Sequence, residues 1–171
     1  MPRYVAFLRG VSPMNVKMAE LKRCFEQHGF EEVKTVLSSG NVVFTASAAA
    51  ETSLAREAEK AMAAQLGHRF FTIVRSVNVL DQLIETDPYA AFRLPPNAKR
   101  VVTFLRDRPK GTLALPLEVE GARILAVKDR HVFTAYVPSD RGAVFMRLIE
   151  KSFGTNVTTR TWQTVKKCAA S

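Results

Sequence analysis

Hydrophobic residues follow one another without interruption from Tyr4 to Leu8, near the start of the chain. A strand that is apolar at every position needs cover on both faces, so this one is predicted to be buried. Arg9 and Gly10 then begin a polar loop. A helix is predicted from about Val16 to His28, with its apolar residues on one stripe. The rest of the chain is expected to be organised around this strand, loop and helix.

The elements that follow complete the order β-α-β-β-α-β. Strands are predicted at 33–37 and 41–45, joined by a tight turn over Ser38-Ser39-Gly40, and a helix at 52–66 precedes a strand at 69–75. This order is typical of a ferredoxin-like unit, in which the third strand lies between the first two and runs antiparallel to both. The loop after Arg9 and the turn at 38–41 are therefore expected at one end of the sheet.

The second half of the chain partly repeats this pattern. After a linker helix at about 77–85 and a proline-containing loop, the predicted strands are 100–105, 123–128, 131–137 and 156–160. Helices are predicted at 143–153 and 161–169, while 111–120 is ambiguous. We therefore predict an α+β fold with two ferredoxin-like (α/β-plait) subdomains packed together and a C-terminal helix. The expected division is 1–76, a helical linker at 77–97, and 98–171 with the terminal helix.

Composition and cysteine content indicate a cytoplasmic protein. The 171 residues are 47% hydrophobic, and the apolar runs are far shorter than the ~20 residues that span a membrane. The apolar run at the N-terminus lacks a cleavage-site pattern, so no signal peptide is expected. Cys24 and Cys168 form no disulfide framework. No membrane partner is expected, and the sequence does not indicate an oligomeric state.

The net charge of +9 is concentrated in two segments of the second half. Residues 93–110 hold six basic residues and one acidic residue, and residues 141–171 hold the same numbers. Such concentration favours an anionic partner, whether nucleic acid, nucleotide or phosphorylated metabolite. A basic surface that only aids solubility is the alternative.

Three ordered stretches read YVAFLRGVSPMNVKMAEL, SSGNVVF and TTRTWQTVKKC. They resemble the patterns YVALLRGINVGG followed by MAEL, QSGNVVF and TTRNWNTVLKL of a bacterial family known as domain of unknown function 1697. The resemblance implies two α/β-plait subdomains in one compact protein and carries no established activity. Pro13 and Met14 stand where the family has two glycines, and Thr161 and Gln163 where it has two asparagines. These departures put in doubt any function that needs those glycines or amides.

A candidate ligand site follows from the topology of the first half. A guanidinium, an ammonium, a hydroxyl and an amide near a glycine turn suit a phosphate or carboxylate. The candidate residues are Arg9, Lys17, Ser39 and Asn41, with Arg160 as a contributor from the second subdomain. The alternative is that Gly40 only permits the turn and Asn41 caps it.

The helix start at Thr158–Gln163 is a second place that attracts anions. Its alternative role is structural, with a threonine N-cap and Trp162 anchoring the last helix in the core.

Other functions have weaker support. An RNA-recognition module has the same element order but needs an open sheet, and the first strand is apolar on both faces. The three histidines have no metal-ligand spacing, Cys24 reads as a small buried hydrophobe, and no cofactor motif is present. The preferred function is binding of an anionic ligand. The alternative is a small-molecule enzyme with its site between the two subdomains, and the sequence indicates no catalytic residue.

Overall fold

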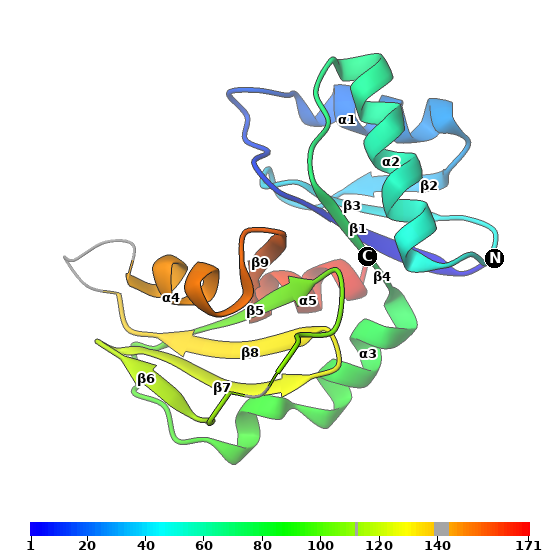
Figure 1. Ribbon diagram of the computed structural model, residues 1–171. Coiled ribbons are helices and arrows are strands. Elements are labelled where there is room, and N and C mark those ends of the chain that lie inside the picture. The colour runs from blue at the N-terminus through cyan, green and yellow to red at the C-terminus, as the bar shows by residue number, and fades with distance from the viewer. Residues whose placement is uncertain (112, 139–143) are drawn as a thin grey trace. The chain divides into compact units, whose positions relative to one another are not determined.

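The computed structural model describes residues 1–111, 113–138 and 144–171. Within them the chain forms an α+β fold with two antiparallel sheets and five α-helices (Figure 1). It divides into two compact units, Met1–Gln82 with Lys166–Ser171, and Leu83–Val165. Both divisions fall inside helices, α3 (Val77–Thr86) and α5 (Trp162–Ala169), whereas the sequence placed its divisions around 77–97.

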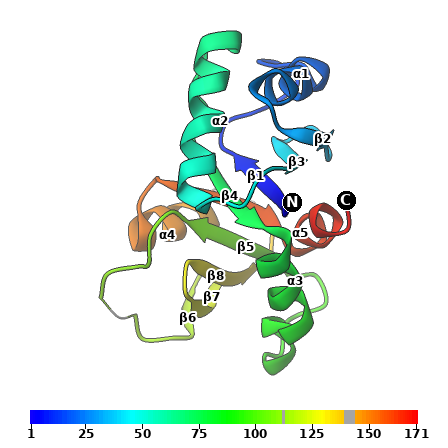
Figure 2. The same ribbon diagram turned by 90° about the vertical axis from the view of Figure 1, so that its right-hand side faces the viewer.

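The first unit contains a four-stranded sheet in the order β2-β3-β1-β4. Its strands are β1 (Arg3–Leu8), β2 (Glu31–Thr35), β3 (Asn41–Thr45) and β4 (Thr72–Ser76). As the sequence predicted, β3 lies between β1 and β2 and is antiparallel to both. The helices α1 (Met18–His28) and α2 (Glu51–Leu66) cover one face of this sheet in both views (Figures 1 and 2).

Both faces of β1 are buried. Its even-numbered residues join the hydrophobic core beneath α1 and α2, namely Tyr4, Ala6 and Leu8. Val5 and Phe7 belong to the other face by strand alternation, and both are 0% exposed. This confirms the prediction made from the uninterrupted apolar run. It also argues against an open RNA-binding face on this sheet, because the central strand offers no exposed side chain.

The strand β2 begins and ends two residues earlier than the sequence predicted. Glu31 already pairs with Thr45, and the register shifts before Lys34. Leu37 cannot extend the strand because its φ is +60°, in the left-handed region. The apolar run at the end of the predicted strand therefore belongs to the turn.

The second unit contains a five-stranded sheet in the order β6-β7-β8-β5-β9. Its strands are β5 (Lys99–Leu105), β6 (Leu117–Val119), β7 (Ala122–Lys128), β8 (His131–Tyr136) and β9 (Val157–Thr161). The predicted hairpin through Asp129 and Arg130 is confirmed, because Lys128 pairs with His131. The short β6 lies in the stretch that the sequence left ambiguous, in which Thr112 is outside the described residues.

The two faces of the second sheet have different cover. The helix α4 (Val144–Phe153) packs its apolar side on one face, with Ile149 in a core that includes Val101 and Val132. Ala143, the expected first residue of this helix, lies outside the described residues. On the other face Phe133 meets two aromatic rings, from Trp162 and from Tyr89 of the short 3₁₀ helix η1 (Pro88–Ala91).

Among the described residues, no helix combines the length and the apolar character that crossing a membrane would require.

Candidate functional site

The two loops that the sequence predicted to meet do meet, at one end of the first sheet. The N–H of Leu8 donates to the carbonyl of Gly40 at 2.8 Å, and the N–H of Arg9 donates to the carbonyl of Phe71 at 2.8 Å. Gly40 has a φ of +88°, and a Cβ atom there would lie 2.9 Å from the Cβ of Val11. The turn therefore requires glycine at this position, because any other residue would have a strained φ angle and its Cβ would clash with Val11 and Leu8.

The buried side chain of Asn41 forms hydrogen bonds within this turn. It is 0% exposed, and its Nδ2 donates to the carbonyl of Val36 at 3.0 Å and to Oγ of Ser39 at 3.1 Å. A buried amide that is hydrogen-bonded to its own turn stabilises the local backbone. These contacts support the structural role that the sequence left as the alternative for Asn41.

Asn15 closes the neighbouring loop, and the sequence did not single it out. Its Nδ2 donates to the carbonyl of Gly10 at 2.7 Å, and its Oδ1 accepts from the N–H of Ser12 at 3.0 Å. Lys17 follows as the exposed residue before α1. The loop is thus held by hydrogen bonds from the side chain of Asn15 to the backbone, which are common for asparagine. From composition alone, an asparagine with this role cannot be told from one that is only exposed to solvent.

The five residues of the predicted site have different environments. Arg9 is half-buried, Lys17 and Ser39 are exposed, and Asn41 is buried. Arg160 is a half-buried residue of β9 in the second unit, where its Nη1 donates to the carbonyl of Thr159 at 2.9 Å. A shared depression formed by these residues stays a prediction.

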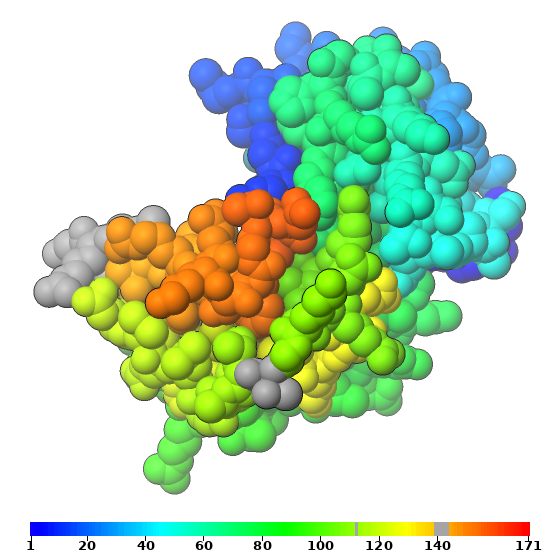
Figure 3. Space-filling model, viewed as in Figure 1, coloured from blue at the N-terminus to red at the C-terminus, as the bar shows by residue number. Residues whose placement is uncertain are grey.

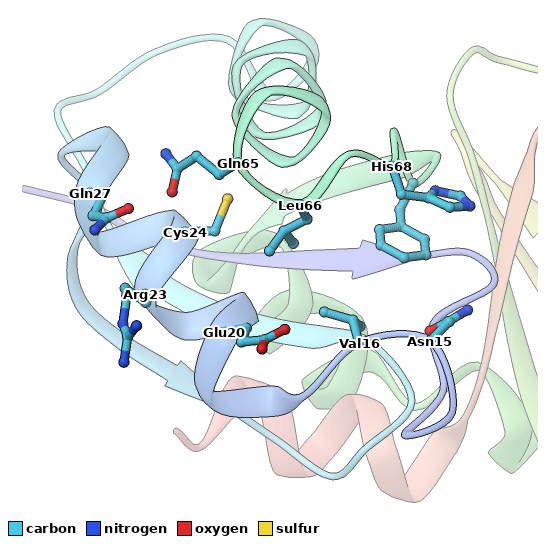
Figure 4. A pocket seen from close by; sticks show the side chains of 10 residues that line it. Asn15, Val16, Glu20, Arg23, Cys24, Gln27, Gln65, Leu66 and His68 are labelled. Atoms are coloured by element: carbon cyan, nitrogen blue, oxygen red, sulfur yellow. The ribbon is translucent and has the colours of Figure 1, made fainter.

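A cavity of about 420 Å³ lies elsewhere in the first unit, between α1 and the end of α2 (Figure 4). Asn15 and His68 lie at one end of it, and Gln27 and Gln65 at the other. Its further lining residues are Val16, Glu20, Arg23, Cys24, Leu66 and Phe70. This lining holds one carboxylate, one guanidinium and the imidazole of His68, so it lacks the excess of fixed cations over carboxylates that would favour an anion.

Cys24 at the floor of this cavity is not an activated nucleophile. It is 1% exposed, and burial raises the pKa of its thiol. A raised pKa keeps the sulfur protonated at neutral pH, whereas nucleophilic attack requires the thiolate. The prediction that Cys24 acts as a small buried hydrophobe is confirmed by its burial.

A second cavity, of about 460 Å³, lies entirely within the second unit. The pairing of β5 with β9 creates it, since Val101 lies opposite Thr161 and the strand ends come together. Its lining residues are Leu94, Pro95, Pro96, Ala98, Lys99, Arg100, Thr161, Trp162 and Gln163. These described lining residues include two cations and no carboxylate. Both cations belong to the basic segment 93–110, and the segment 141–171 contributes Thr161, Trp162 and Gln163.

Arg100 is positioned by an aromatic ring. Its guanidinium carbon lies 5.7 Å from the ring centroid of Tyr89, a cation–π contact that contributes about 0.5–1 kcal/mol at an exposed site. Tyr89 is 1% exposed and donates its hydroxyl to the carbonyl of Val101 at 2.7 Å. Burial raises the pKa of Tyr89, so this hydroxyl stays a donor at neutral pH. The exposed guanidinium of Arg100 is thus held on a fixed support.

The start of α5 forms another wall of this cavity. Oγ1 of Thr161 accepts from the N–H of Thr164 at 3.2 Å, so the predicted threonine N-cap is confirmed. Trp162 is 2% exposed and its ring lies 5.3 Å from that of Tyr89, which confirms its anchoring role. Gln163 is exposed in the first turn. The backbone at this helix end carries a partial positive charge, which adds to that of the two cations.

Thr161 and Gln163, which stand where the family has two asparagines, both line this cavity. Gln163 keeps an amide, while the hydroxyl of Thr161 is engaged in the cap. The sequence predicts a helix start at Thr158–Gln163 and shows a basic segment at 93–110. It could not join them, because their pairing depends on the register of two strands that are more than fifty residues apart in the chain.

Comparison with known proteins agrees with this fold. The chain is similar to the solved structure of the conserved bacterial protein SP0830 from Streptococcus pneumoniae, with a TM-score of 0.73 and 22% identity. The likeness covers 99% of this chain and 97% of that chain, and at this identity it shows the fold alone. The search of curated proteins gave no match. A family model described as protein of unknown function (DUF1697) matches residues 1–133, which confirms the resemblance found in the motifs. The chain belongs to the DUF1697 family.

Proposed function

We propose that this protein binds an anionic ligand, such as a nucleotide, a phosphorylated metabolite or nucleic acid, in the cavity of the second unit. One observation carries the proposal. Lys99, Arg100 and the first turn of α5 line a single cavity whose described lining residues include no carboxylate. Ammonium, guanidinium and a helix N-terminus each stabilise a negative group, and here they surround the same space.

The arrangement of Arg100 strengthens this proposal. Fixing a long flexible side chain on binding costs about 0.5–1.5 kcal/mol. The ring of Tyr89 already restricts this guanidinium, so part of that cost is met during folding. The cavity is also large enough to admit more than a single phosphate group, and Pro95 and Pro96 give it an apolar wall. These features favour a ligand that combines a phosphate with an organic part.

The proposal needs no residue of the first unit, and it differs in location from the site expected around Arg9. The enzyme expected between the subdomains is a separate hypothesis, for which the described residues supply no activated nucleophile at either cavity. Binding is therefore the function that the geometry supports best.

We also infer that both units are variants of the ferredoxin-like plait. In the first, helices follow β1 and β3, and the strand order β2-β3-β1-β4 is that of a β-α-β-β-α-β unit. In the second, β7-β8-β5-β9 follows the same order; in the described part of the chain α4 follows β8, and no helix lies between β5 and β7. The strand β6 is added at the edge.

A thermal-shift experiment with inorganic pyrophosphate and AMP tests the binding proposal. A ligand that binds only the folded protein stabilises it by about 2.7 kcal/mol at a hundredfold excess over Kd. We expect the Tm of the wild type to rise and the rise to disappear in the double variant Lys99→Gln, Arg100→Gln. Lys60→Gln, at an exposed residue of α2, is the control and should keep the rise.

Arg9→Met separates the two candidate locations in the same experiment. If the shift survives in the Lys99, Arg100 variant and is lost in Arg9→Met, the ligand binds at the end of the first sheet and the proposal is wrong. A shift that survives in every variant would place the ligand elsewhere and would equally overturn it.

A further inference from the structure

A second basic cavity lies at the opposite end of the strand pair β5–β9. Its volume is about 270 Å³. The segment after β5 contributes Arg106, Arg108 and Lys110, and the end of α4 contributes Phe153. Figure 3 shows these two segments side by side at the surface of the second unit, in yellow-green and orange. The described lining residues include three cations and one carboxylate, that of Asp107.

The antiparallel pairing fixes the separation of the two cavities. The first uses Arg100 at the start of β5, and the second uses Arg106 directly after its end. A strand advances about 3.4 Å per residue, so these two residues are about 20 Å apart along the strand. The partner strand agrees, because Thr161 lines the first cavity and Asn156 lines the second.

The described lining of this cavity holds more cations than carboxylates, and one of the cations, Arg108, pairs with an aspartate outside the lining. Nε of Arg108 donates to Oδ1 of Asp129 at 2.6 Å, and Nε of Arg130 lies 3.5 Å from Oδ2 of the same carboxylate. This carboxylate offsets part of the charge of Arg108. Lys110 is an exposed cation of the lining, and the half-buried Arg106 lies in the same lining.

We propose that the two cavities together bind one extended anionic polymer, a single strand of nucleic acid, with phosphates held at both ends of β5–β9. This inference rests on the proposed function of the first cavity. A small anion occupies one cavity only, since about 20 Å exceeds the length of a phosphate group or a small phosphorylated metabolite. A strand of nucleic acid, by contrast, carries phosphates at regular short intervals; along one strand of B-form DNA they recur about every 3.4 Å.

The shape of the cavities favours an unpaired strand over a duplex. Both cavities combine cations with apolar surface, from Pro95 and Pro96 in the first and from Phe153 and Pro109 in the second. Such surfaces accept a sugar or base beside the phosphate, as in proteins that bind single-stranded nucleic acid. Bases in a duplex are stacked inside and cannot enter two separate cavities.

Fluorescence anisotropy with labelled oligothymidylates of 2, 4, 8 and 12 nucleotides, at low salt, tests this inference. For the wild type we expect affinity to rise at least tenfold from the dinucleotide to the octanucleotide and then to level off. In Arg106→Glu, Lys110→Glu the dinucleotide should bind as in the wild type, while the gain with length should be lost. The slope of log affinity against log salt should flatten by about 0.7 for each phosphate contact removed.

Two variants support this comparison. Lys22→Glu, Lys60→Glu changes the net charge equally at exposed residues of α1 and α2, and it should keep the gain with length. Lys110→Glu alone should lose part of the rise in affinity with oligonucleotide length. It replaces the double variant in the experiment if circular dichroism shows that the double variant does not fold.

The outcomes separate this inference from the proposed function. If the wild type binds the dinucleotide as tightly as the dodecanucleotide, or the Arg106, Lys110 variant keeps the gain, the polymer inference is overturned and the first cavity is unaffected. Equal or tighter binding of a twelve-base-pair duplex would also overturn it.

If no oligonucleotide binds but pyrophosphate shifts the Tm through Lys99 and Arg100, the polymer inference fails and the proposed function stands. If pyrophosphate gives no shift that depends on Lys99 and Arg100, the proposed function fails, and this inference fails with it.

Discussion

The two units share a strand order but close the ends of their sheets in different ways. In the first unit a helix follows both β1 and β3, and the loops at the sheet end are held by Asn15 and Asn41. In the second unit α4 follows β8, while the described residues between β5 and β7 form turns and the three-residue β6. Among the described residues of the second unit no helix lies between β5 and β7, and cations of 99–110 line the cavities at both ends of β5.

This difference shows how a crossover helix restricts which residues a unit can carry at its surface. A helix over a sheet must place an apolar stripe on it, as Leu21 and Phe25 of α1 do in the first unit. A segment that runs past the end of the sheet has no such requirement and can carry charge. The second unit therefore has room for basic cavities at both ends of β5, and the first unit has a cavity that lacks an excess of fixed cations over carboxylates.

The largest expected effect comes from isolating the first sheet as a fragment of residues 1–76. The face opposite α1 and α2 carries four apolar residues that are 2% exposed or less, namely Val5, Phe7, Val43 and Ile73. Burial of each such side chain contributes about 1.5–3 kcal/mol, and their sum is comparable to the ~5–15 kcal/mol that stabilises a whole protein. We expect the fragment to aggregate and to show no cooperative transition by calorimetry. A soluble monomer with a sharp transition would show that residues 1–76 fold without the rest of the chain.

A pair of glycine variants measures how tightly the end of the first sheet is closed. Gly10 and Gly40 have similar φ angles, +82° and +88°, but only a Cβ at Gly40 meets atoms within 4 Å. Alanine at Gly10 should therefore cost only the left-handed strain of roughly 1–2 kcal/mol. Gly40→Ala should cost roughly 1–3 kcal/mol more, because Val11 and Leu8 must move. Urea denaturation measures both values, and equal costs would mean that the turn can relax away from β1.

The smallest expected effect concerns an ion pair of the second unit. Partial burial acts to raise the pKa of Asp129, but the hydrogen bond and charge of Arg108, with those of Arg130, outweigh it and lower the pKa. A carboxyl with a lowered pKa contributes stability above the ordinary aspartate pKa, and this is lost as the pH falls through the lowered value. Asp129→Asn should thus cost less than about 1 kcal/mol at pH 7, because the pair is exposed.

The pH dependence provides the check on Asp129. The difference in Tm between wild type and Asp129→Asn should shrink as the pH falls below 3.8, where the wild-type carboxyl also becomes protonated. A difference that stays constant down to pH 2 would mean that the carboxylate does not stabilise the fold. High salt at pH 7 should reduce the difference in the same way.

Local patterns in the sequence were sufficient to predict most of the elements. The uninterrupted apolar run of β1 required cover on both faces, and Val5 and Phe7 are fully buried. The apolar spacing in α1 predicted its buried side, on which Leu21, Cys24 and Phe25 lie. Thr161 and Trp162 took the predicted cap and anchor positions. Each of these properties depends on neighbours within one or two turns of helix or along one strand, so the sequence alone contains the necessary information.

The cavity lined by Lys99 and Arg100 depends instead on tertiary structure. Lys99 and Arg100 are about sixty residues from Thr161 and Gln163, and they line one space only because β5 and β9 pair in one particular register. A register is specified by which face of a strand is buried and by the connections between strands. For β5 and β9 both involve residues far apart in the chain. For the same reason the sequence identified two basic segments, while the tertiary structure decided that they meet at both ends of one strand pair.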